Sequence, residues 1–167
     1  MTTASPNIDY KNLFFEHPVL TRIIDEPAIS SLITLRNEVK ANAMSVHTTL
    51  GGGVYGHLGL VVSAQEYSTI PGTAPYVRPV HPGVLQIPNA ATQYAIANLR
   101  ETHHEDLRLF REVIGVERAL IQQIVAAVEP KYLKALRNAI TDQITATIPQ
   151  ISSTCLIIMA MLMKKIC

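Results

Sequence analysis

The chain has 167 residues, a formal net charge of +1 at pH 7, and only 16% Lys, Arg, Asp and Glu. This length fits one domain with a hydrophobic core of its own. Its cations form no run, whereas binding to a phosphate backbone needs several clustered Lys or Arg side chains. The composition therefore argues against direct nucleic-acid binding by this chain.

The cysteines argue against an oxidising compartment. The two cysteines, Cys155 and Cys167, both lie in the last thirteen residues, and the body of the chain has none. A disulfide framework therefore does not stabilise the fold, and the N-terminus lacks the apolar core of a secretory signal. We expect a cytoplasmic protein.

The first 25 residues are predicted to form an N-terminal arm. Leu13, Phe14 and Phe15 are consecutive apolar residues, which favours either a short helix or an extended segment packed on a neighbour. Residues 1–7 are expected to be disordered. The domain proper is predicted over residues 26–150, and a separate apolar tail over residues 151–167.

The first long helix is predicted to begin near Glu26 and to end near Met44. Pro27 suits the first helical position, where a missing N–H group costs nothing. Spacings of three and four residues indicate one buried face. The residues predicted on that face are Ile29, Leu32, Ile33, Arg36 and Val39.

A long segment rich in glycine and proline follows, over residues 48–88. The apolar run 58–62 favours either a short strand or a buried loop. Ser63 and Glu66 have the spacing of a capping box, so a short helix is expected over residues 64–70. Five prolines between residues 71 and 88 exclude regular helix and central strand, so this part should run extended over the surface.

The longest helical pattern is predicted to begin after Asn89, a favourable N-cap residue. Gly115 interrupts it and predicts a kink or a break. Pro130 then starts a new helix, because proline disfavours helix at the residue before it. The predicted apolar face of this last helix comprises Tyr132, Leu133, Leu136 and Ile140. The prediction is a single all-α domain of five to six helices with a long, structured Gly/Pro-rich loop.

Gly51, Gly53 and Gly56 match the G-x-G-x-x-G pattern of nucleotide-binding loops. That pattern binds nucleotide when a strand precedes it and a helix follows, and here a helix is predicted before it. We interpret it as a tight turn in which glycine permits positive φ. His47 and His57 flank the turn without the paired spacing of a zinc site, and His57 is expected to be a buried donor to loop carbonyls.

The other reactive side chains also have structural interpretations. His103 and His104 are adjacent and should point to different faces of a solvated helix. Cys155 lies in an apolar run, which is typical of an inert thiol. Glu112 and Glu117 are predicted on the solvent-exposed face of the long helix. We therefore predict no catalytic residue, no cofactor-binding residue and no metal ligand, and no enzyme activity.

Four ordered strings resemble the N-terminal Gag (capsid-like) region of copia-type retrotransposons. They are residues 47–62 (HTTLGGGVYGHLGLVV), 76–83, 107–113 and 117–138. The resemblance covers about residues 15–151. It implies a helical, capsid-like domain that self-associates through helical faces into a particle around element RNA. RNA contact is then expected only indirectly or through segments missing from this chain.

The sequence departs from that family after Ile151. Residues 156–163 form one uninterrupted apolar run that is followed by two lysines. The run is shorter than the about twenty residues that span a bilayer. One interpretation is a truncated, frameshifted reading frame. The alternative is a small helical interaction module with a C-terminal membrane-seeking tail.

Overall fold

The computed structural model describes residues 8–24, 28–144, 147–149 and 151. Within these residues the fold is all-α, as predicted, and its only β-contact is an isolated bridge between Arg137 and Ile144. The α-helices are α1 (Tyr10–Leu13), α2 (Ile29–Met44), α3 (Ala64–Ser68), α4 (Gln93–Ala127) and α5 (Pro130–Leu133). The 3₁₀ helices are η1 (Leu50–Gly52), η2 (Leu58–Leu60) and η3 (Lys134–Leu136). The disorder expected for residues 1–7 lies outside the described residues.

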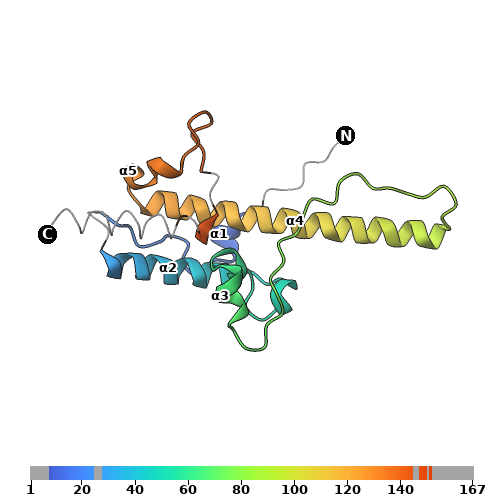
Figure 1. Ribbon diagram of the computed structural model, residues 1–167, viewed down its shortest axis with the longest axis horizontal. Coiled ribbons are helices and arrows are strands. Elements are labelled where there is room, and N and C mark those ends of the chain that lie inside the picture. The colour runs from blue at the N-terminus through green and yellow to red at the C-terminus, as the bar shows by residue number, and fades with distance from the viewer. Residues whose placement is uncertain (1–7, 25–27, 145–146, 150, 152–167) are drawn as a thin grey trace.

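Helices α2 and α4 form the centre of the molecule (Figure 1). They run antiparallel and side by side, and α1 packs on the middle of α4. The core gathers between them because their apolar stripes face each other. Its most buried members, all less than 3% exposed, include Val39, Ala43, Val61, Val113, Val116, Leu120, Leu133, Ile148 and Ile151.

The N-terminal segment enters this same core. Phe15, Leu20 and Ile23 are buried, and the backbone N–H of Ile23 donates to the carbonyl of Ala127 at 2.8 Å. Asp9 caps α1 by accepting a hydrogen bond from the N–H of Asn12. Of the two forms predicted here, the short helix is present, and it is followed by an irregular segment packed on this chain's own α4.

The kink predicted at Gly115 is wrong. Helix α4 continues without interruption for 35 residues, and Gly115 lies in its middle. A side chain there would place its Cβ 2.7 Å from Cε2 of Tyr10. Gly115 therefore allows Tyr10 to approach the helix closely.

The predicted boundaries are partly right. Thr92, not Asn89, caps α4: its hydroxyl accepts a hydrogen bond from the N–H of Ala95 at 3.2 Å. Pro130 does begin α5 as predicted, with Glu129 as its N-cap. That helix ends at Leu133, so the predicted stripe does not reach Ile140, which is 93% exposed.

The face predicted for α2 is largely wrong. Ile29 and Ile33 are about half exposed, whereas Leu35, Asn42 and Ala43 are buried along with Val39. Helix α4 covers a stripe that contains the polar residue Asn42, so the more apolar neighbouring stripe stays partly open. The predicted end at Met44 is correct.

The segment after α2 is a buried loop, one of the two predicted forms. Leu58 and Leu60 are buried in the 3₁₀ helix η2. Ser63 caps α3 as predicted, because its hydroxyl accepts from the N–H of Glu66 at 3.1 Å. The Glu66 carboxylate does not reach back to the cap. It pairs instead with Arg36 at 2.9 Å.

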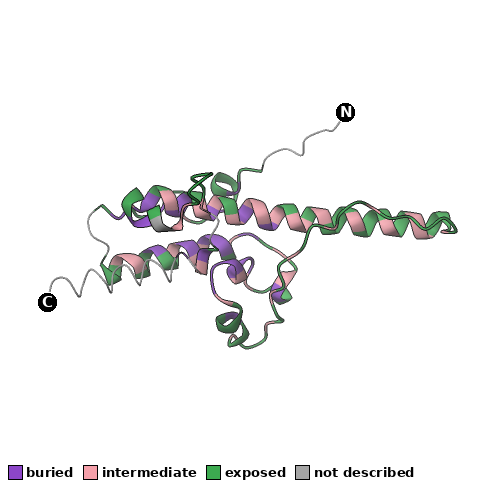
Figure 2. Cartoon of the chain, turned by 45° about the horizontal axis from the view of Figure 1, so that its top comes forward, coloured by how far each residue is buried: buried purple, intermediate pink, exposed green. Residues whose placement is uncertain are grey.

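One end of the molecule extends away from the core (Figures 1 and 2). Residues 77–92 run without helix or strand along the first half of α4, and the first buried residue of α4 is Val113. We call residues 77–111 the projection and the other described residues the head. Figure 2 shows the buried residues concentrated in the head.

Candidate functional site

The glycine-rich turn packs against the protein itself. Gly51, Gly52, Gly53 and Gly56 all have positive φ, between 53° and 87°, which confirms the predicted turn. The hydroxyl of Tyr67 donates to the carbonyl of Gly51 at 2.9 Å, and a Cβ at Gly51 would overlap the Tyr67 ring. The turn is therefore shaped to receive Tyr67.

A buried polar network joins this turn to α4. His57 is fully buried, with Nδ1 2.8 Å from the Tyr76 hydroxyl and Nε2 2.7 Å from Oε1 of Glu112. The other Glu112 oxygen accepts from Arg108 at 2.8 Å, and Arg108 also pairs with Glu105. The network thus connects the glycine turn, the start of the extended segment and α4.

The charges in this network fix its hydrogen-bond directions. An ionised carboxylate only accepts, so Nε2 of His57 carries the hydrogen directed at Glu112. Nδ1 of His57 forms the second hydrogen bond, with the Tyr76 hydroxyl. Burial works against ionisation of Glu112, but hydrogen bonds and charge from His57 and Arg108 hold its pKa below the ordinary value of 4.5. Burial raises the pKa of Tyr76.

The sequence-based interpretation of these residues needs correction. His57 is buried, as expected, but its partners are Tyr76 and Glu112 and not loop carbonyls. Glu112 and Glu117 do not lie on a solvent-exposed face of α4, because their side chains are only 13% and 16% exposed. A signal was present: Glu112 lies four residues before Val116 and thus on the buried stripe. Both ring nitrogens of His57 are hydrogen-bonded within the protein, to Tyr76 and Glu112. The network therefore positions the glycine turn against α4.

A second buried network joins the N-terminal segment to both central helices. Asn42 donates to the Gln123 side chain at 2.9 Å and to the carbonyl of His17 at 3.0 Å. Gln123 donates to the carbonyls of His17 and Pro18 at 3.1 and 2.8 Å. Because buried polar groups must be paired, these bonds fix where the N-terminal segment crosses α2 and α4.

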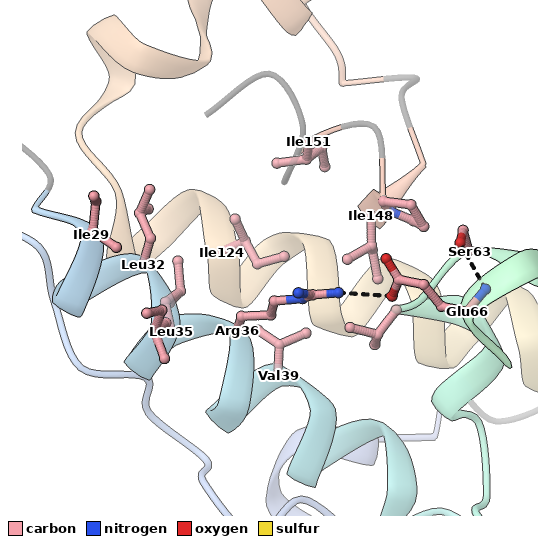
Figure 3. A pocket seen from close by; sticks show the side chains of 13 residues that line it. Ile29, Leu32, Leu35, Arg36, Val39, Ser63, Glu66, Ile124, Ile148 and Ile151 are labelled. Atoms are coloured by element: carbon pink, nitrogen blue, oxygen red, sulfur yellow. Dashed lines mark hydrogen bonds and ion pairs between the residues drawn. The ribbon is translucent and has the colours of Figure 1, made fainter. Parts of the chain in front are cut away.

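An apolar groove opens beside α2, with a volume of about 240 Å³. Figure 3 shows Ile29, Leu32 and Leu35 of α2 on one side and Ile148 and Ile151 on the other. Ile124 of α4 lies between these walls, and the Arg36–Glu66 ion pair lies at the polar end. The incorrectly predicted face of α2 thus lines this groove.

Ion-pair, hydrogen-bond and ring contacts hold the projection. Arg78 forms a two-pronged ion pair with Glu117, and the carbonyl of Gly83 lies 2.8 Å from Nε2 of His103. The His81 ring packs edge-on against Phe110. The large apolar side chains at least two-thirds exposed here are Val77 (68%), Val80 (82%), Val84 (82%) and Tyr94 (79%).

The remaining candidate residues are not brought together. His47 and His104 are exposed, and His103 faces the extended segment, so the two adjacent histidines do point differently. No three His, Cys, Asp or Glu side chains among the described residues converge as around a metal ion. In the same part of the chain no helix has the length and apolarity to cross a membrane. Cys155 and the predicted tail lie outside the described residues.

None of the protein-family models, curated proteins or solved structures compared with this chain matches it.

Proposed function

We propose that this chain is a structural, self-associating protein of the capsid type, a Gag-like fragment of a retrotransposon that acts without catalysis. The observation that supports it is the projection. There the first half of α4 is covered on one side by a single extended segment, residues 77–92. Copies of the protein meet through this surface, and RNA is reached only indirectly or through segments outside this chain.

The length of the projection supports an assembly role. From Gln93 to Val113, α4 runs about 30 Å without a buried residue. Isolated helices are marginal in water, and an amphipathic helix gains most of its stability from a packed partner. The extended segment leaves Ile96, Leu99 and Leu107 only half-buried. A second copy supplies the missing layer.

The exposed valines make this surface apolar and thus suited to association. Val80 and Val84 are each 82% exposed, and Tyr94 near the tip is 79% exposed. Burial of such side chains drives association at about 25 cal/mol per Å² of apolar area. Residues 77–111 contain four arginines and three acids, so their net charge of +1 opposes contact between copies only weakly.

Light scattering coupled to size-exclusion chromatography tests this proposal. The full chain should show a mean mass that rises with protein concentration. The double variant Val80→Asp/Val84→Asp should stay monomeric, because each added carboxylate would have to be desolvated in the interface.

Val54→Asp is the control. Val54 is 62% exposed and lies in the glycine turn, outside residues 77–111. It should associate like the unsubstituted chain. A monomer at every concentration, or equal loss of association in both variants, would contradict the proposal.

A further inference from the structure

The apolar groove beside α2 lacks a complete cover among the described residues. Ile29 and Ile33 on its wall are 51% and 54% exposed, although both side chains are large and apolar. Leu32 is half-buried next to them. A concave apolar surface of this kind in a folded domain normally has an occupant.

The chain itself leads to the groove. Ile148, Pro149 and Ile151 form its far wall, and Ile151 is the last described residue. Sixteen residues follow in the sequence, starting with Ser152, Ser153 and Thr154. Any segment tethered so closely has an effective concentration in the millimolar range at the groove.

The composition of that segment matches the groove. Residues 156–163 read LIIMAMLM, eight apolar residues without a charge. Their three methionines suit an irregular apolar surface, because the unbranched side chain adapts to gaps. The wall of α2 from Ile29 to Val39 is about 15 Å long, and eight residues span at least about 12 Å in any regular conformation.

We propose that residues 156–163 occupy the groove of their own molecule. The occupant is thus this chain's own apolar tail, and the groove is not a docking site for a second copy. The four residues 152–155 act as the connector. The proposal does not depend on self-association through the projection, since it concerns a different surface and an intramolecular contact.

Disulfide trapping tests the contact directly. In the full chain, Cys167→Ser leaves Cys155 as the single native cysteine, directly before the apolar run. Ile33→Cys then places a partner on the exposed rim of the groove. Because a disulfide needs Cα atoms within about 7 Å, oxidation should link Cys155 to position 33 within one molecule.

Thr34→Cys is the matched control, since Thr34 is also exposed but does not line the groove. It is rotated by about 100° around the helix from Ile33. Oxidation is performed at concentrations where light scattering gives a monomer. A monomeric disulfide at least tenfold faster at position 33 than at 34 is expected. Equal rates, or a disulfide-linked dimer, would overturn the proposal.

A second experiment uses no engineered cysteine. Ile158→Asp/Leu162→Asp should uncover the groove, raise the fluorescence of a dye that binds apolar surfaces and accelerate hydrogen exchange in α2. Ser152→Asp/Ser153→Asp adds the same two charges outside the apolar run and should change neither. The proposal fails if the double variant behaves like the control. It also fails if the unsubstituted chain sediments with anionic vesicles through these residues while the Cys167→Ser/Ile33→Cys chain forms no disulfide between Cys155 and position 33.

Discussion

The two halves of α4 differ in what covers them, although both have an amphipathic pattern. From Val113 onward the helix meets α2, the N-terminal segment and the buried loop, and it buries Val116 and Leu120 completely. Before Val113 it runs along the extended segment and contacts the buried loop through Glu112, and its apolar residues are at most half-buried. An apolar stripe therefore predicts which face of a helix packs against other segments. How deeply that face is buried depends on segments far away in the sequence.

The largest expected effect comes from removing one leucine from each half. Leu120→Ala should lower the free energy of unfolding by about 2–5 kcal/mol, because it leaves a cavity in a fully buried site. Leu99→Ala in the projection should cost about 1 kcal/mol, because that side chain is only half-buried. Urea unfolding followed by circular dichroism gives both values. Equal losses would mean that the two halves are equally packed.

The next effect contrasts two acids that share Arg108. Glu112→Ala leaves the buried Nε2–H of His57 without an acceptor and should cost about 1–3 kcal/mol. Glu105→Ala removes only the exposed partner of Arg108 and should leave the urea midpoint unchanged. If the two variants unfold at the same urea concentration, the His57 network does not stabilise the fold.

A smaller effect is expected where the projection joins the head. Arg78→Ala removes the ion pair with Glu117, which is half-exposed on the arginine side, and should cost about 0.5–1 kcal/mol. Proteolysis within residues 77–92 should become faster, since this pair anchors their start. Arg100→Ala, a change at an exposed arginine on the same projection, is the control and should leave the cleavage rate unaltered.

The smallest effect is a change in pH dependence. The folded-state pKa of Glu112 lies below its ordinary 4.5, so the stabilisation by its charge is complete above pH 4.5 and is lost as pH falls through the folded pKa. The groups facing Glu112 are His57, Arg108, Tyr10 and Tyr76. Glu112→Gln should flatten this acid limb in unfolding curves measured from pH 6 to 3. An acid limb identical to that of the unsubstituted chain would refute the assignment.

The features that the sequence predicted correctly are local ones. Ser63 caps α3 through an amide three residues later, Pro130 starts α5, and the glycines of the turn adopt positive φ. Each depends on a single residue's covalent geometry or on a hydrogen bond within one turn. Such effects operate on the neighbouring residues alone, so a sequence is enough to predict them.

The failures involve partners distant along the chain. Gly115 predicts a kink when the sequence is read alone. In the structure Tyr10, 105 residues earlier, packs against it and α4 is unbroken. The open stripe of α2 looks like the core face because its true core face contains Asn42, which is paired with Gln123. Glu112 looks solvated because its partner His57 comes from a loop. In each case a tertiary contact overrides the local pattern.

The unbroken course of α4 has a mechanical consequence. The helix is a stiff rod whose inner part is seated in the head, with Tyr10 resting at Gly115 like a pivot. The tip at Gln93 lies about 33 Å from that pivot, so a tilt of about 5° in the seat displaces the tip by roughly 3 Å. Small rearrangements around Tyr10 therefore produce larger displacements at Gln93. A displacement of that tip is likewise transmitted along the helix to the core.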